Sequence, residues 1–194
     1  MNQDTLHDRS AAFKLVLASL LLATLACTID VGGPEPPGAL IPADPGSGEQ
    51  VRQTWQSAIQ SAASDGVVRV LLNESQLTGF IAERFRRDEN PLLTEPQVYL
   101  RQGEIEIFGI AQRGIFSGRI LIAIRPQITD QGEIRFDLSE AKIGPVPAPE
   151  ALRDTISALL TEAFTGSIGT LATGIRITSL VIADGEMAIV GELR

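Results

Sequence analysis

The chain has 194 residues and a formal net charge of −8, with 16 lysines and arginines against 24 aspartates and glutamates. This length is enough for one domain with a sizeable core, and the acidic balance gives no electrostatic reason to bind nucleic acid. The chain has one cysteine, Cys27, and one histidine, His7, which excludes an internal disulfide and any cysteine-rich metal site. We therefore expect no metal, no cofactor and no nucleic-acid partner.

An apolar run, LVLASLLLATLA, occupies residues 15–26. It is shorter than the roughly 20 residues that span a bilayer, and it has the length of the apolar core of a secretory signal. Because small Ala26 directly precedes the single cysteine, residues 1–27 resemble a bacterial lipoprotein signal, although Leu25 stands closer to the cysteine than that pattern places it. The resemblance implies that Cys27 is lipidated and becomes the mature N-terminus. The alternative is an uncleaved anchor, and both predict an exported domain anchored on the outer side of the bacterial cytoplasmic membrane.

Residues 28–48 carry five of the 11 prolines of the chain and five glycines. A stretch of this composition cannot bury a core and is semi-extended. We interpret it as a tether between the anchor and a single α+β domain that spans residues 49–194.

Two helices with a strand between them open the domain. Residues 49–64 have apolar positions at helical spacing, and Ser47 is a candidate N-cap. The lone tryptophan, Trp55, lies on the apolar face, where a core or lid anchor is favoured over a stacking platform for a ligand. Residues 67–72, VVRVLL, predict a short strand.

The second helix begins after Asn73, with Gln76 three residues on as its capping-box partner. It ends in a short basic cluster, which we interpret as a solvated face, with a contact to anionic lipid head groups as the alternative. The cluster consists of Arg84, Arg86 and Arg87.

A three-stranded meander is predicted over Val98–Leu138, with turns at Gln102-Gly103 and at residues 130–132. The segment Arg119–Arg125 differs from its neighbours because it is apolar on both faces. Such a strand is either covered on both sides or open on one side to an apolar ligand. One face carries Ile120, Ile122 and Ile124, and the other carries Leu121 and Ala123.

The C-terminal part predicts a long amphipathic helix at residues 150–164 and a closing hairpin around Asp184-Gly185, a dipeptide favoured in tight turns. Both faces of the hairpin's first strand are apolar by simple alternation. Ile175, Ile177 and Val181 are expected on one face, and Leu180 and Ile182 on the other.

No motif for catalysis is recognisable. There is no nucleophile elbow and no phosphate loop, and loss of residues 1–26 would leave a mature chain without histidine. Carboxylates such as Glu104, Glu106 and Asp154 fall on solvent-side positions, where they serve solubility. We expect that the protein is not an enzyme, and a pair of acids converging in a cleft would be needed to overturn this.

Four segments resemble bacterial envelope proteins of the tubular lipid-binding (TULIP-like) group, including the LmeA-like and YpmS-like families. They are LLNESQLTGFIAERF, PQVYLRQGEIEIFGIA, AKIGPVPAPEAL and GIRITSLVIADGEMAIVGEL, in this order within residues 67–193. The resemblance implies a curved antiparallel sheet around a long helix, with an apolar groove for lipid and no catalytic motif. The tether and the Trp55 helix have no counterpart in that pattern.

The sequence therefore predicts an α+β fold, with a curved antiparallel sheet packed on or wrapped around a long amphipathic helix, and additional N-terminal helices. We expect a membrane-tethered lipoprotein that binds a lipid or another apolar ligand between the sheet and the helix at residues 150–164. The alternative is a non-catalytic structural or protein-docking module of the cell envelope. The candidate ligand-lining residues are Ile120, Leu121, Ile122, Ile124 and Leu180.

Overall fold

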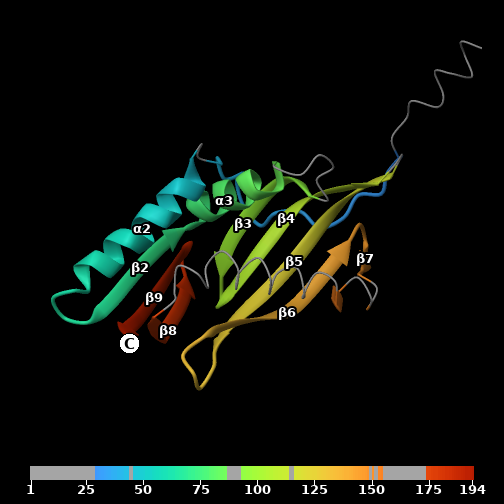
Figure 1. Ribbon diagram of the computed structural model, residues 1–194. Coiled ribbons are helices and arrows are strands. Elements are labelled where there is room, and N and C mark those ends of the chain that lie inside the picture. Colours follow the sequence, from blue (N-terminus) through green and yellow to red (C-terminus); the bar gives the residue numbers. More distant parts are fainter. Residues whose placement is uncertain are drawn as a thin grey trace, which may run out of the picture.

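The computed structural model shows an α+β chain with antiparallel sheets and two helices, which confirms the predicted fold class (Figure 1). It describes residues 29–43, 46–86, 93–113, 116–148, 150, 153–154 and 174–194. The helix expected at residues 150–164 lies almost wholly outside this part of the chain.

The described elements, in chain order, are two helices and nine strands. They are β1 (Ile29–Asp30), α2 (Ser47–Ser61), β2 (Val67–Asn73), α3 (Glu74–Arg86), β3 (Thr94–Arg101), β4 (Glu104–Arg113), β5 (Phe116–Ile128), β6 (Ile134–Ile143), β7 (Val146–Pro147), β8 (Ile175–Ala183) and β9 (Glu186–Leu193).

The large sheet has the order β3-β4-β5-β6-β7, with β1 parallel to β5 at its side (Figure 1). Consecutive strands pair antiparallel, as predicted for the meander, but the predicted number of three strands is wrong, because four strands, β3 to β6, cover Val98–Leu138. Its first turn has positive φ at both Gln102 and Gly103, 49° and 83°. A two-residue hairpin turn with both central φ values positive matches the twist of the strands that it joins.

The small sheet has the order β2-β9-β8. The predicted closing hairpin is confirmed, with φ of 52° at Asp184 and 82° at Gly185. The two sheets meet at their turns, because Gly103 N donates to Ile182 O and Gly185 N donates to Leu100 O.

The expected face pattern of β8 is wrong in one respect. The pairing of β8 with β9 shifts between Ile177 and Ser179, which is a β-bulge. The extra residue reverses the side-chain alternation beyond it. Ile182 therefore joins Ile175 and Ile177 in the core, whereas Val181 is 55% exposed.

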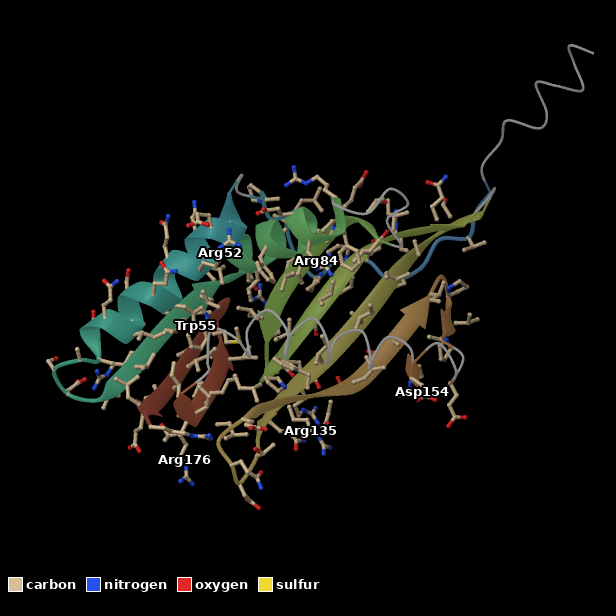
Figure 2. All side chains as sticks on the ribbon, in the orientation of Figure 1. Arg52, Trp55, Arg84, Arg135, Asp154 and Arg176 are labelled. Carbon is tan, nitrogen blue, oxygen red and sulfur yellow. The ribbon has the colours of Figure 1, made fainter. Side chains whose placement is uncertain are left out.

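Helix α2 lies against β2, and its buried face includes Trp55, which has no exposed surface (Figure 2). Trp55 is thus a core residue, as expected. The expected N-cap at Ser47 is wrong, because the helix starts one residue earlier. Gly46, at φ 83°, is the N-cap, and its carbonyl accepts from the backbone N–H groups of Glu49 and Gln50. Gly46 has no side chain to cap the end, but Glu83 Oε2 of α3 accepts from the backbone N–H of Gly48 at 3.2 Å.

Helix α3 begins with the predicted capping box. The backbone N–H of Gln76 donates to Asn73 Oδ1 at 2.9 Å, and the backbone N–H of Asn73 donates to Gln76 Oε1 at 3.1 Å. The helix then lies against β3, where buried Thr78 accepts through Oγ1 from the backbone N–H of Val98 at 3.0 Å. Leu100 N likewise donates to Glu74 Oε1, so α3 lies along the free edge of β3. We define the inner face of the large sheet as the face that carries Val98 and Ile124, which share one core with Leu77 and Ile81 of α3.

One core joins α2, α3, the small sheet and the inner face of the large sheet. A second, smaller cluster lies on the opposite, outer face of the large sheet. It consists of Tyr99, Phe108 and Leu121, with Ile41 packed against it.

Ile41 belongs to the segment that the sequence predicts to be a tether. The described part of that segment, residues 29–43, contacts the large sheet instead of extending away from it. Tyr99 Oη donates to Ala39 O at 2.9 Å, and the backbone N–H of Ile41 donates to Gln97 Oε1. Proline and glycine content does not show that such a segment has a partner surface.

Candidate functional site

The five candidate lining residues divide between the two faces of the large sheet. Ile120, Ile122 and Ile124 lie on the inner face, where Leu180 of β8 packs against the same core. Leu121 lies on the outer face. The structure therefore brings four of the five together and separates the fifth from them.

Leu121 is covered by protein. It is 9% exposed, and its neighbours on the outer face are Tyr99 and Phe108. The rings of these two residues pack edge to face, with their centroids 5.6 Å apart. Ile41 packs on this cluster from the N-terminal segment. The second apolar face of the central strand is thus explained by an internal contact, and Leu121 does not line a groove on the inner face.

The inner face of the large sheet is covered unevenly. Helix α3 contacts β3, β8 of the small sheet contacts β3 and β5, and Leu100 and Ile105 are almost fully buried. On β5 and β6, Ile120 and Ile124 are buried, Ile128 is 37% exposed, and three of the partly buried apolar side chains border the core. They are Ile122, Ile134 and Ile143, all packed against the edge of the core.

The register of β5 with β6 identifies every inner-face position of this pair. A bulge beside Ser139 keeps the apolar residues of β6 on one face, and Ser139 Oγ donates to Ala123 O at 3.0 Å. None of these described positions carries a charge or a side-chain hydrogen-bonding group. They are Ile120, Ile122, Ile124, Pro126 and Ile128 on β5, and Ile134, Phe136, Leu138, Ala141 and Ile143 on β6.

Two surface hollows also occur among the described residues, and neither contains a candidate lining residue. One, of about 640 Å³, has a mostly polar wall that includes Gln53, Ser57 and Arg69. The other, of about 390 Å³, has a more apolar wall that includes Leu40, Phe85 and Leu93. The second hollow could not be predicted from the sequence, because its wall combines the N-terminal segment, α3 and β3.

The outer face is charged, and its carboxylates are mostly paired. Arg125 pairs with Glu104, and Lys142 pairs with Glu140. Burial raises the pKa of the Glu106 carboxyl, the nearby charge of Glu104 adds to this, and Arg101 opposes it. Within the described part of the chain, no group of three or more potential ligands is arranged to hold a metal ion.

The basic cluster at the end of α3 is exposed where the structure describes it. Arg84, labelled in Figure 2, and Arg86 are both exposed. Arg87 lies outside the described residues, and so does Cys27. Among the helices of the described segments, none is long and apolar enough to cross a membrane.

A scan of the chain against protein-family models finds no match, and a search of curated proteins also finds none. The resemblance to the TULIP-like group therefore remains a prediction from the sequence.

Proposed function

We propose that the protein is a non-catalytic, membrane-tethered envelope lipoprotein that binds a lipid or another apolar ligand along the inner face of β5 and β6. The observation that carries this proposal is the uncharged inner face of these strands, on which Ile122, Ile134 and Ile143 remain partly exposed. Attachment through Cys27 or through the apolar segment before it holds the domain at the membrane on the outer side of the cytoplasmic membrane.

The physical basis is burial of apolar surface. Each Å² of acyl chain that moves from water onto these side chains contributes roughly 25 cal/mol. A face without a charged group imposes no desolvation cost on such a ligand. The predicted helix at residues 150–164 would close the site, so that the sheet curves around the helix and the ligand lies between them.

Filling the proposed site tests it without removing apolar surface. Ile122→Trp adds a bulky ring on the inner face, whereas Gln127→Trp places the same ring at an exposed position of β5 on the outer face. Mass spectrometry under native conditions, after gentle purification, measures the lipid-bound fraction of each protein. We expect bound lipid in the wild type and in Gln127→Trp, and much less in Ile122→Trp. A wild-type protein without co-purified lipid that also fails to take up added phospholipid would rule the proposal out.

A structural or protein-docking module is the second candidate. It is favoured by the burial of Ile120 and Ile124, which are 8% and 0% exposed. If this candidate is right, Ile122→Trp disturbs packing and stability, and no variant carries lipid.

A further inference from the structure

The N-terminal segment joins the large sheet immediately after the proposed anchor. Ile29 is paired with Phe116 and Asp30 with Ser117, at the start of β5 (Figure 1). The backbone N–H of Val31 donates to Ser117 O, and Arg119 N donates to Gly32 O. Since Ile29 follows Cys27 by two residues, the anchor can lie no more than about 7 Å from it along the chain.

Glycines make room for this segment. A Cβ atom on Gly33 would lie 2.7 Å from Arg119 O and 2.8 Å from Gly144 Cα. A Cβ atom on Gly144 would lie 3.1 Å from Val31 Cγ2. Backbone therefore passes directly over backbone at this point, and this close approach requires residues without side chains.

The rest of the segment is also held. Glu35 pairs with Arg119, and the backbone of Ala39 accepts from Tyr99 Oη. Farther along, Ser75 Oγ at the start of α3 donates to Pro42 O at 2.8 Å. Because these contacts hold the segment against the domain, it cannot act as a long spacer between the anchor and the domain.

We propose that the domain sits directly on the lipid surface, with the β4–β5 end of the large sheet towards the membrane and the β5–β6 turn away from it. This inference rests on the membrane attachment proposed above, and it holds for lipidated Cys27 and for an uncleaved anchor alike. The 13 residues of β5 span roughly 40 Å at about 3.3 Å per residue. In this orientation the Ile143 end of the proposed ligand site, which pairs with the start of β5, is nearer to the membrane than the Ile134 end.

Two single-tryptophan reporters test the orientation in the full chain. Both are built on Trp55→Phe, and each replaces an exposed glutamine. Gln112→Trp lies near the end of β4, and Gln131→Trp lies in the β5–β6 turn. In phosphatidylcholine vesicles with nitroxide-labelled head groups, we expect several-fold stronger quenching of the reporter at 112 than of the reporter at 131.

A pair of glycine variants tests whether the docked segment sets the orientation. Gly33→Ala places a methyl group against backbone, whereas Gly32→Ala, also at positive φ, has no atom within 4 Å of the added Cβ. We expect Gly33→Ala to release the segment and remove the difference between the reporters. Gly32→Ala should retain the difference, and both variants should still float with the vesicles.

The outcomes separate the orientation from the attachment. If the two reporter proteins with unchanged Gly33 float but show equal or reversed quenching, the orientation is overturned and the attachment is left intact. Failure to float would overturn both. A difference that persists in Gly33→Ala would show that the docked segment does not set the orientation. Mass spectrometry of the same samples shows whether residue 27 carries lipid.

Discussion

Val31 and Gly118 are in direct contact, such that a Cβ atom on Gly118 would lie 2.8 Å from Val31 Cγ2. Gly118→Ala should therefore loosen the N-terminal segment, because overpacking of this kind costs about 1–3 kcal/mol. Hydrogen exchange at the Arg119 amide, which donates to Gly32 O, measures the loosening, and the exchange rate should rise.

The double variant Gly118→Ala with Val31→Ala is the control, because it removes the atom that the new methyl group would meet. Exchange at Arg119 should return towards the wild-type rate. If Val31→Ala does not reduce the effect of Gly118→Ala on the exchange rate of the Arg119 amide, the contact between residues 31 and 118 does not hold the segment.

The capping box of α3 gives a second prediction. Asn73→Ala removes the side-chain acceptor of the Gln76 amide and should lower the free energy of unfolding by about 1 kcal/mol. Denaturant unfolding measures the change. Gln56→Ala, at an exposed position of α2, should change the free energy by less than about 0.5 kcal/mol. Equal effects of the two substitutions would contradict the role of the cap.

Local turn and capping chemistry explains why much of the fold could be predicted from the sequence. Asn73 with Gln76, and Asp184 with Gly185, act through backbone atoms a few residues away, so their effect is visible in a short stretch of sequence. The alternation of apolar residues around Ile122 also predicted the inner face correctly.

What could not be predicted depends on contacts between distant segments. The bulge after Ile177 reverses the faces of Val181 and Ile182, and one extra residue in a strand leaves no local signal. By composition Gly33 belongs to a semi-extended tether, but in the structure it packs closely on the backbone of Arg119 and Gly144. The alternation showed that Leu121 points away from Ile122, but not that the N-terminal segment covers it.

A buried threonine connects α3 to the large sheet and gives the third prediction. Thr78→Val keeps the shape but removes the acceptor of the Val98 N–H, which should lower the free energy of unfolding by about 1–3 kcal/mol. Thr78→Ser retains the hydroxyl and should fold with the Val98 hydrogen bond intact. Protection of the Val98 amide in hydrogen exchange separates the two. An equally protected amide in Thr78→Val would disprove the role of the hydroxyl.

Glu106 gives a prediction for pH. Burial first, and then Glu104, raises the pKa of its carboxyl above the ordinary value of 4.5, whereas Arg101 lowers it. The unfolded chain ionises first as pH rises, so the folded state loses stability from about pH 4.5 up to the raised pKa. Glu106→Gln should therefore be more stable than the wild type at neutral pH, and this advantage should disappear below pH 4.5.

Unfolding midpoints at several pH values measure this difference. Glu133→Gln removes the same charge from an exposed position and serves as the control. The higher stability of Glu106→Gln could instead be constant across the pH range, or Glu133→Gln could share it. Either result would show that burial of the Glu106 carboxylate does not cause the higher stability.

Two neighbouring residues of β6 on opposite faces of the sheet distinguish an apolar ligand on the inner face of β5 and β6 from non-specific binding. In a Trp55→Phe background, Ile134→Trp places a reporter on the inner face, and Arg135→Trp places one on the exposed outer face. Fluorescence is measured while residues 28–194, produced without the proposed signal, are titrated with a fatty acid brominated on its acyl chain. We predict saturable quenching of the reporter at 134 and none at 135, whereas equal quenching at both positions, or none at either, would contradict the proposed ligand site.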